Sequence, residues 1–428
     1  MDERKLRRRE IFGFMMFDFA NSSYTTVVIT AVFNAYFVRA VVNEANRGEL
    51  LWAVSLSISY FLVMILGPVF GAMADQTGHK KRFLLATYIL CVVFTALLFF
   101  VKPGYVVFAM VLVVLSNVGY AASENFVSSF LPDIAGEKEM GRISGYAWSF
   151  GYVGGLLSLL ICLLIISFYK PAANETLPIR LSALVTALFF GGAAIPTFLW
   201  VRERRSADSS SRGDGYFKMA FQRLGATAKN VSKFKELLKF LIALFFFYSG
   251  IAVVISFAAI YAQKELGFTP EMTVLLIIVV NITAVVGAVL FGLLGDRIGL
   301  KNTIVITLII WVATVGTAYF TYTQQLFWLV ANLAGIAMGA SQSSARALVG
   351  LFSPPSKSAE FFGFWGFAGK FSAILGILSF GIMSNRFHSN RLAILSTIFY
   401  FIVGLLILLF VNEKRGREAA LSYDEGKP

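Results

Sequence analysis

Four ionisable residues lie inside long apolar runs of this sequence, and their signs form two groups. Asp18 and Glu124 are acidic and fall in the first half of the chain, whereas Arg346 and Lys370 are basic and fall in the second half. A charge in an apolar environment is costly unless it faces water or a partner. The four charges sum to zero, so we expect them to neutralise one another around a shared polar site. A static salt bridge from Glu124 to Arg346 or Lys370 is the structural alternative.

These side chains predict a site for a small polar solute. The guanidinium of Arg346 offers a fork of donors that suits a carboxylate or a phosphate. Asp18 and Glu124 can hold an ammonium group or carry a coupling proton, because burial disfavours the charged form of a carboxyl group. A zwitterion such as an amino acid satisfies both signs.

The segments that must position these charges are membrane helices. Hydrophobic residues make up 57% of the 428 positions, charged residues only 14%, and the mean hydropathy is +0.74. A helix needs about 20 apolar residues to cross a bilayer, and the chain offers twelve such windows. We therefore predict an all-α integral membrane protein with spans near 14–38, 52–74, 83–101, 105–129, 144–169, 179–201, 238–262, 272–294, 303–320, 325–351, 361–383 and 390–411.

The two halves of the chain form an internal sequence repeat. A constant offset of 221 positions places Gly71, Asp75, Gly78 and Lys80 on Gly292, Asp296, Gly299 and Lys301. The same offset relates Glu139, Gly145 and Gly155 to Glu360, Gly366 and Gly376. Duplicated apolar spans with short basic loops are typical of transporters. We expect six-helix bundles at 1–201 and 238–411, a linker at 202–237 and a tail at 412–428.

The net charge of +13 is distributed unevenly. Most lysines and arginines fall in the tails and in the even-numbered loops, which predicts that both termini are cytoplasmic. This charge suits anionic lipid headgroups, so no nucleic acid partner is needed. The pattern over 217–238 predicts a basic amphipathic helix on the same leaflet.

The loop from Gly71 to Arg82 resembles the signature between the second and third helices of major facilitator superfamily transporters. The resemblance implies that Asp75, with Lys80, Lys81 and Arg82, forms a gate latch that makes and breaks during transport. The second copy keeps Asp296, Arg297 and Lys301 but has Asn302 and Thr303 in place of two cations. A basic loop that only fixes topology is the alternative.

Other motifs narrow the resemblance to the Atg22-like (UMF1-type) branch of this superfamily. Phe17 to Tyr24 is similar to its Tyr-Asp-Trp-Ala-Asn-Ser-x-Tyr motif, with Phe17 and Phe19 in place of two aromatic residues. Further similar segments are Asn125–Phe126, Phe130–Ile134, Gly141–Gly155, Gly339–Ala347, Pro354–Pro355 and Ala359–Phe364.

The resemblance implies a fold of two six-helix bundles that rock around a site near the middle of the membrane. Helices 1, 4, 7 and 10 line that site in the superfamily, which implies Asn21, Tyr24, Asn125 and Gln342 as neighbours of the charges. For the branch it implies export of amino acids from a fungal vacuole. We expect a proton-coupled monomer in a bacterial inner membrane or a specialised intracellular membrane.

Several function classes find no support in the sequence. It has no nucleotide-binding loop, no metal-ligand spacing and no paired catalytic carboxylates, so we expect no enzyme and no cofactor. Cys91 and Cys162 lie in apolar spans and predict neither a disulfide nor a metal site.

Two alternatives remain. One is transport of a metal ion or chelate such as iron, through oxygen ligands from Asp18, Asn21 and Glu124. The other is a membrane scaffold that recruits partners through segment 217–238. Small-residue spacings, Gly151 with Gly155 and Gly363 with Gly366 and Gly369, predict sliding contacts between the halves.

Overall fold

The computed structural model describes residues 3–169, 176–204, 224–225 and 231–425. Within those ranges every regular element is helical, and twelve segments are long and apolar enough to cross a membrane. The predicted number of spans is therefore confirmed. The first span is longer than expected and runs from Glu3 to Val41.

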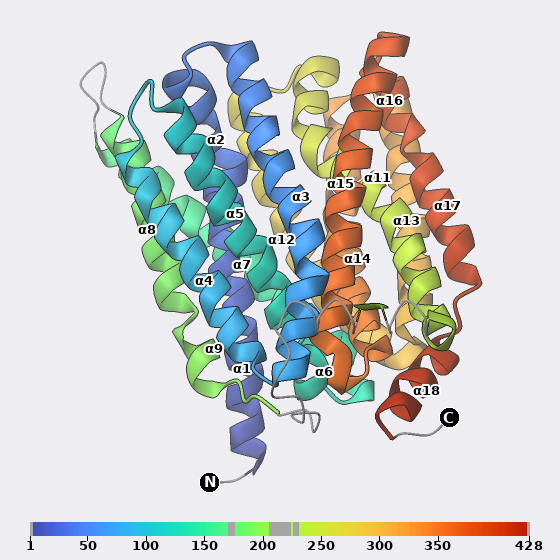
Figure 1. Cartoon of the computed structure of the whole chain (residues 1–428). Coiled ribbons are helices and arrows are strands. Elements are labelled where there is room, and N and C mark those ends of the chain that lie inside the picture. The colour runs from blue at the N-terminus through green and yellow to red at the C-terminus, as the bar shows by residue number, and fades with distance from the viewer. Residues whose placement is uncertain (1–2, 170–175, 205–223, 226–230, 426–428) are drawn as a thin grey trace.

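The helices of the first half run up and down the bundle (Figure 1). Their bounds are α1 Glu3–Ser23, α2 Phe33–Tyr36, α3 Ala45–Thr77, α4 Lys80–Leu97, α5 Val106–Ser128, α6 Leu131–Ile134, α7 Met140–Phe168, α8 Leu177–Ala193 and α9 Ile195–Trp200. Short 3-10 turns occupy Leu98–Phe100 and Glu137–Glu139.

The second half repeats this course. Its bounds are α11 Lys235–Leu266, α12 Pro270–Ile298, α13 Leu300–Phe320, α14 Gln324–Phe352, α15 Ser358–Phe387, α16 Asn390–Ser396, α17 Ile398–Leu409 and α18 Glu413–Asp424. Turns of 3-10 helix precede α11 at Val231–Phe234 and α15 at Pro355–Lys357. Of the basic helix predicted over 217–238, most lies outside the described residues.

The first span is not a regular α-helix. Residues Tyr24–Ala31 and Phe37–Val41 form π-helix on either side of α2. Stretches of π-helix are rare in proteins as a whole, and those that occur often lie at functional sites. Each wider turn displaces the side chains that follow it. Here the first wide turn begins at Tyr24, directly after the segment that carries Asp18 and Asn21.

Both chain ends lie at the same end of the bundle, which we call the terminal face (Figure 1). The opposite end is the distal face. Short loops that begin with glycine connect consecutive helices at the terminal face. Gly78, for example, follows the last residue of α3, has a φ of 64° and lies two residues before the start of α4. This left-handed conformation favours glycine.

The two halves meet along two related helix pairs. Helix α3 packs against α15, and α12 packs against α7. Figure 1 shows α3 and α15 side by side in the centre of the bundle. The offset of 221 positions relates α3 to α12 and α7 to α15, so these contacts are two copies of one interface.

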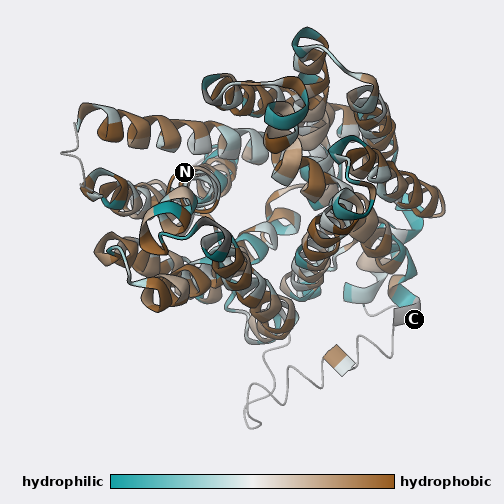
Figure 2. Ribbon diagram, turned by 90° about the horizontal axis from the view of Figure 1, so that it is seen from above, coloured by the Kyte–Doolittle hydropathy of each residue, from teal (hydrophilic) through white to brown (hydrophobic). Residues whose placement is uncertain are grey.

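The outer surface suits a lipid environment. Large apolar side chains such as Val107, Leu188, Leu199 and Phe399 are more than half exposed. Viewed along the helix axes, most of the ribbon carries hydrophobic residues (Figure 2). Since helices satisfy their own backbone hydrogen bonds, apolar side chains can face the acyl chains directly.

Candidate functional site

Arg346 and Asp18 form a buried ion pair between the two halves. Nη1 of Arg346 lies 2.6 Å from Oδ2 of Asp18, and only 1% of the Arg346 surface is exposed. Its Nε donates to the hydroxyl of Ser144 at 3.1 Å, and Nη2 donates to the Ser144 carbonyl oxygen at 3.0 Å. The Phe14 and Trp148 rings lie 5.3 and 5.4 Å from the guanidinium carbon. The protein itself therefore holds this guanidinium from several sides.

Glu124 and Lys370 occupy a different environment. Nζ of Lys370 lies 5.4 Å from the ring centre of Tyr60 and 6.0 Å from that of Tyr120. The charge of Glu124 interacts with Lys370, Asp18 and Arg346. Both side chains are partly exposed, unlike Arg346. The structure thus brings the four sequence-predicted charges together, but it pairs Arg346 with Asp18 and not with Glu124.

The predicted polar neighbours lie at different depths. Tyr24 is fully buried and shares a 2.9 Å hydrogen bond with Ser116. Gln342 accepts a 2.5 Å hydrogen bond from Tyr152, which joins α14 to α7. Asn21 is buried and accepts from the Ser22 hydroxyl at 3.4 Å.

Asn125 lies at the interface between the halves. An added Cβ on Gly366 of α15 would come within 2.2 Å of its Nδ2, and within 2.5 Å of its Oδ1. The Nδ2 atom is buried and has no hydrogen-bond partner among the described residues.

Several tyrosines at the site were missed in the sequence. Tyr60, Tyr120, Tyr152 and Tyr248 lie beside the charged residues. The position of Tyr120, one helical turn before Glu124, was a usable signal because residues four apart share a helix face. Tyr60 and Tyr248 had no such signal, since no ionisable residue lies within one helical turn of either in the sequence.

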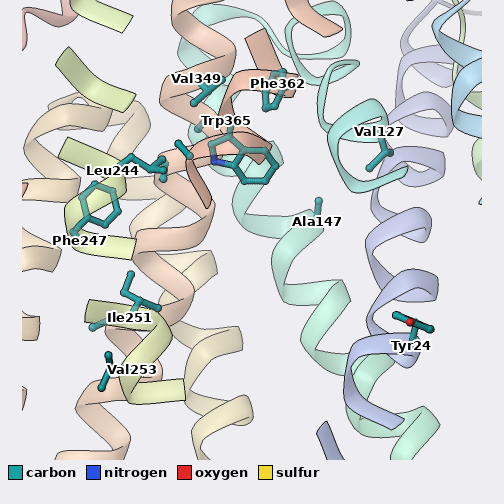
Figure 3. Packing of buried hydrophobic residues seen from close by; sticks show 14 of the residues in the cluster. Tyr24, Val127, Ala147, Leu244, Phe247, Ile251, Val253, Val349, Phe362 and Trp365 are labelled. Atoms are coloured by element: carbon teal, nitrogen blue, oxygen red, sulfur yellow. The ribbon is translucent and has the colours of Figure 1, made fainter. Parts of the chain in front are cut away.

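Buried donors with few acceptors lie beside the charged residues. The hydroxyl of Tyr248 interacts with the indole N–H of Trp365 and has no acceptor for its own proton among the described residues. Nε1 of Trp148, whose ring lies 5.4 Å from the Arg346 guanidinium carbon, is buried without a hydrogen-bond partner there. Figure 3 shows the Trp365 indole on the side of α15 that faces Ala147 of α7, away from Leu244 and Phe247. Buried donors without acceptors are uncommon in proteins and suggest that an acceptor arrives from elsewhere.

At the terminal face, Asp75 caps a helix of the opposite half. Its two carboxylate oxygens accept from the backbone N–H groups of Ala359 and Glu360 at 3.1 and 2.8 Å, at the start of α15. Asp75 is 1% exposed. Negative charge at a helix N-terminus is favourable because the first N–H groups lack helical partners.

Asp296 makes the corresponding contact in the second copy. It accepts from the N–H groups of Gly141 and Arg142 at 2.8 and 3.3 Å, at the start of α7. Its side chain is 11% exposed, and Nε of Arg142 lies 3.8 Å away. The duplicated loops therefore form two related contacts between the halves.

The basic residues of these loops divide into three groups. Lys80 reaches the other half: its Nζ donates to the Ser358 hydroxyl and to the Pro355 carbonyl oxygen, and pairs with Asp75 and Asp133 at 3.7 and 3.4 Å. Lys81 stays within its own half, where it donates to the Val201 carbonyl oxygen and to Glu203. Arg82 and Arg297 are exposed.

The contacts of Lys301 differ from those that the offset predicts. Its backbone N–H donates to Glu413 at 2.8 Å and its Nζ to the Leu409 carbonyl oxygen at 2.9 Å. These are the counterparts of the Lys81 contacts, so Lys301 plays the part of Lys81 and not of Lys80. The physical reason is that α13 begins one residue closer to Gly299 than α4 does to Gly78.

The predicted sliding glycines need a correction. Gly363 and Gly366 do lie against the opposite half, at Gly67 and Asn125 respectively. Gly151 and Gly155 instead face α1 of their own half, and Gly369 faces Tyr248 of its own half. Equal spacing on a helix sets which residues share a face but not which neighbour that face meets.

The described residues contain no group of three or more His, Cys, Asp or Glu arranged to hold a metal ion. Cys91 and Cys162 are buried free thiols.

The sequence matches a known family over most of its length. The family described as "Vacuole effluxer Atg22 like" matches residues 50–141 and 136–421. The chain is 28% identical to the uncharacterized MFS-type transporter YxiO of Bacillus subtilis, over 95% of this chain and 96% of that protein. It is 23% identical to autophagy-related protein 22-1 of Penicillium rubens, over 90% and 78%.

The fold is shared with solved transporters. The chain superposes on FucP, an MFS transporter in the outward conformation, with a TM-score of 0.74 at 13% identity, covering 95% of this chain and 98% of that one. The human organic anion transporter MFSD10 gives 0.72 at 13% identity, covering 94% and 99%. Together with the twelve spans and the duplicated interface, these matches show that the chain belongs to the Atg22-like family of major facilitator superfamily transporters.

Proposed function

We propose that this transporter moves a small zwitterion or organic acid, an amino acid in the favoured case, by alternating access. The two halves would rock about the site formed by Asp18, Glu124, Arg346 and Lys370. The names of the fungal relatives and of the family support a solute carried across an internal membrane.

The observation that carries this proposal is the surroundings of Glu124 and Lys370. Two partly exposed charges of opposite sign lie in the middle of the bundle, each supplied by a different half. The Tyr248 hydroxyl, whose proton has no acceptor among the described residues, lies close to Glu124 and beside Trp365. A carboxylate of the solute would supply acceptors to the Tyr248 hydroxyl and to Lys370, while its ammonium group would face Glu124.

Asp18 and Arg346 would have a separate part in this mechanism. Their ion pair joins α1 to α14, so the halves separate there only when the pair breaks or rearranges. A proton on Asp18 would weaken the attraction and leave Arg346 to Ser144, its other hydrogen-bond partner. Asp18 and Glu124 are thus the two candidates for proton coupling.

The Asp75 and Asp296 contacts would act as latches that hold the terminal face closed. Each ties the end of one half to a helix N-terminus of the other. We place this face in the cytoplasm because the termini and most basic loop residues lie there. The host membrane would be a bacterial inner membrane or a specialised intracellular membrane.

Uptake into proteoliposomes tests the proposal. Radiolabelled amino acids and organic acids are offered with and without an inward pH gradient, to wild type, Asp18→Asn, Glu124→Gln and the exposed control Glu44→Gln. We expect gradient-driven uptake by wild type and the control, and its loss in at least one of the two site variants. Unchanged uptake in both variants would show that neither carboxyl group carries the proton.

Transport of a bare metal ion is less well supported by the site. Asp18, one of its three candidate ligands, is committed to Arg346 at 2.6 Å. A metal would have to displace that guanidinium, and the described residues offer no group of three or more His, Cys, Asp or Glu arranged to hold it. Metal chelates of organic acids are added to the uptake panel to test this alternative.

A further inference from the structure

The immediate surroundings of Lys370 have the composition of a cation receptor. Tyr60 of α3 and Tyr120 of α5 present ring faces to its ammonium group at 5.4 and 6.0 Å. Glu124 follows Tyr120 by one helical turn and supplies a negative charge that acts on Lys370. Aromatic faces combined with a carboxylate are the chemistry that recognises ammonium compounds.

This receptor is built by the first half alone. Tyr120 is stacked on Tyr24 with ring centres 5.3 Å apart, and the Tyr24 hydroxyl is anchored to Ser116 at 2.9 Å. Tyr60 interacts with Glu124. One face of Tyr120 is thus taken by a fixed ring, and the cage keeps its shape without any contribution from the second half.

The cation in the cage comes from the other half. Lys370 lies on α15, and the structure pairs its ammonium group with no carboxylate within 4 Å among the described residues. A lysine stem of four methylene groups can swing away from the cage at modest cost. The occupant is therefore tethered and exchangeable, in contrast to Arg346, which is held by Asp18 and Ser144.

We propose that Tyr60, Tyr120 and Glu124 form a receptor for an ammonium group, and that Lys370 fills it when no solute is bound. An incoming ammonium group displaces Nζ of Lys370, which then turns to the acidic group of the same solute. This inference rests on the proposed function in placing solute at the same site.

The exchange makes Lys370 a specificity-determining residue. With Lys370 present, the cage and its occupant sum to zero, so a plain amine that displaces the lysine leaves an uncompensated cation in the site. A zwitterion leaves none. Removal of the lysine gives the cage a net negative charge, and plain amines become ligands.

Chemical rescue of Lys370→Ala tests this directly. The substitution keeps Cβ and removes three carbons and the ammonium nitrogen, which together match n-propylammonium. The probe is propylammonium chloride, with 1-propanol as the uncharged control of equal length and sodium chloride as the ionic control. Thermal unfolding in detergent is measured for wild type, Lys370→Ala and the exposed-lysine control Lys264→Ala.

We expect propylammonium to raise the unfolding temperature of Lys370→Ala by at least about 2 °C, since a ligand of the folded state stabilises it by mass action. Wild type and Lys264→Ala should show no such shift, and 1-propanol should give none. The shift should vanish when Glu124→Gln is added to Lys370→Ala, and should weaken when Tyr60→Leu is added.

Equal shifts in wild type and Lys370→Ala would overturn the proposal, as would a shift that survives the added Glu124→Gln. Lys370→Met, which keeps an apolar stem and lacks only the ammonium nitrogen, is measured in parallel with ammonium chloride as its probe, in case the alanine variant does not fold. Absence of a shift in whichever of the two folds would also overturn it. The outcome is independent of transport: a failed amino acid uptake assay with a positive rescue would reject the solute class and keep the ammonium receptor.

Discussion

The two latches at the terminal face are copies of one contact, and yet they differ in burial. Both aspartates accept two backbone N–H groups at the start of a helix in the opposite half. Asp75 is 1% exposed and shares Lys80 with Asp133, whereas the Asp296 side chain is 11% exposed beside an Arg142 that is 41% exposed. The two copies therefore share their backbone hydrogen bonds and differ in the burial of the aspartate and in the cations beside it.

Burial decides what each latch contributes. A charge that loses its partner inside the protein costs about 3 to 5 kcal/mol, whereas exposed pairs are worth about 0 to 1 kcal/mol. We therefore infer that the Asp75 latch dominates closure of the terminal face. The Asp296 latch adds a smaller, salt-sensitive contribution.

The largest effect is expected for Asp75→Asn. The variant loses a carboxylate that accepts from two N–H groups, and Asp133 becomes the one remaining carboxylate partner of Lys80 among the described residues. It should favour the open terminal face by about 3 kcal/mol. Distances between spin labels at the exposed positions Arg202 and Lys414 would report the shift. An unchanged distance distribution would mean that the buried latch does not control closure.

Glycine-to-alanine substitutions test the same two contacts between the halves through steric clash. An added Cβ at Gly71 would lie 2.3 Å from the Ala359 carbonyl oxygen, and one at Gly292 would lie 2.8 Å from the Gly141 carbonyl oxygen. We expect Gly71→Ala to weaken closure by about 2 kcal/mol and Gly292→Ala by about 1 kcal/mol. Gly381→Ala is the control because nothing lies within 4 Å of its added Cβ. The same pair of labels measures all three, and a reversed order would contradict the comparison.

Asp296→Asn should have a smaller effect than Asp75→Asn. The loss of charge beside a half-exposed arginine is expected to favour opening by about 1 kcal/mol. Because surface charges are screened, the difference from wild type should shrink between 50 mM and 500 mM salt. A penalty equal to that of Asp75→Asn would show that burial does not separate the two latches.

The smallest effect is expected for the carboxylates that act within one half. Glu203 accepts from the N–H group of Lys81, and Glu413 accepts from that of Lys301. Glu203→Gln and Glu413→Gln should lower the unfolding temperature slightly and leave the label distances as in wild type. A change in those distances would indicate that these residues also couple the halves.

The duplicated loops show how far the sequence predicts this fold. Twelve apolar windows and an offset of 221 positions were enough to predict the helices and to single out Asp75 and Asp296. The offset could not assign Lys301, because a one-residue change in where α13 begins moves every later side chain around the helix.

The central site was predictable in composition but not in pairing. The charges of Asp18, Glu124, Arg346 and Lys370 stand out in apolar spans, so their meeting could be expected. Which acid meets which base depends on the rotation of each helix, which apolar sequences specify weakly. The cage tyrosines are 2 among 16 tyrosines and 43 phenylalanines, so residue type alone could not mark them.

The zero sum of the four intramembrane charges has an electrical consequence. Moving one elementary charge through the membrane field costs about 2.3 kcal/mol per 100 mV. If Asp18, Glu124, Arg346 and Lys370 stay ionised and move through the field together, reorientation of the empty carrier transfers no net charge. Only a proton or a charged solute would then couple the cycle to the voltage, so the return step should run at the same rate in polarised and depolarised membranes.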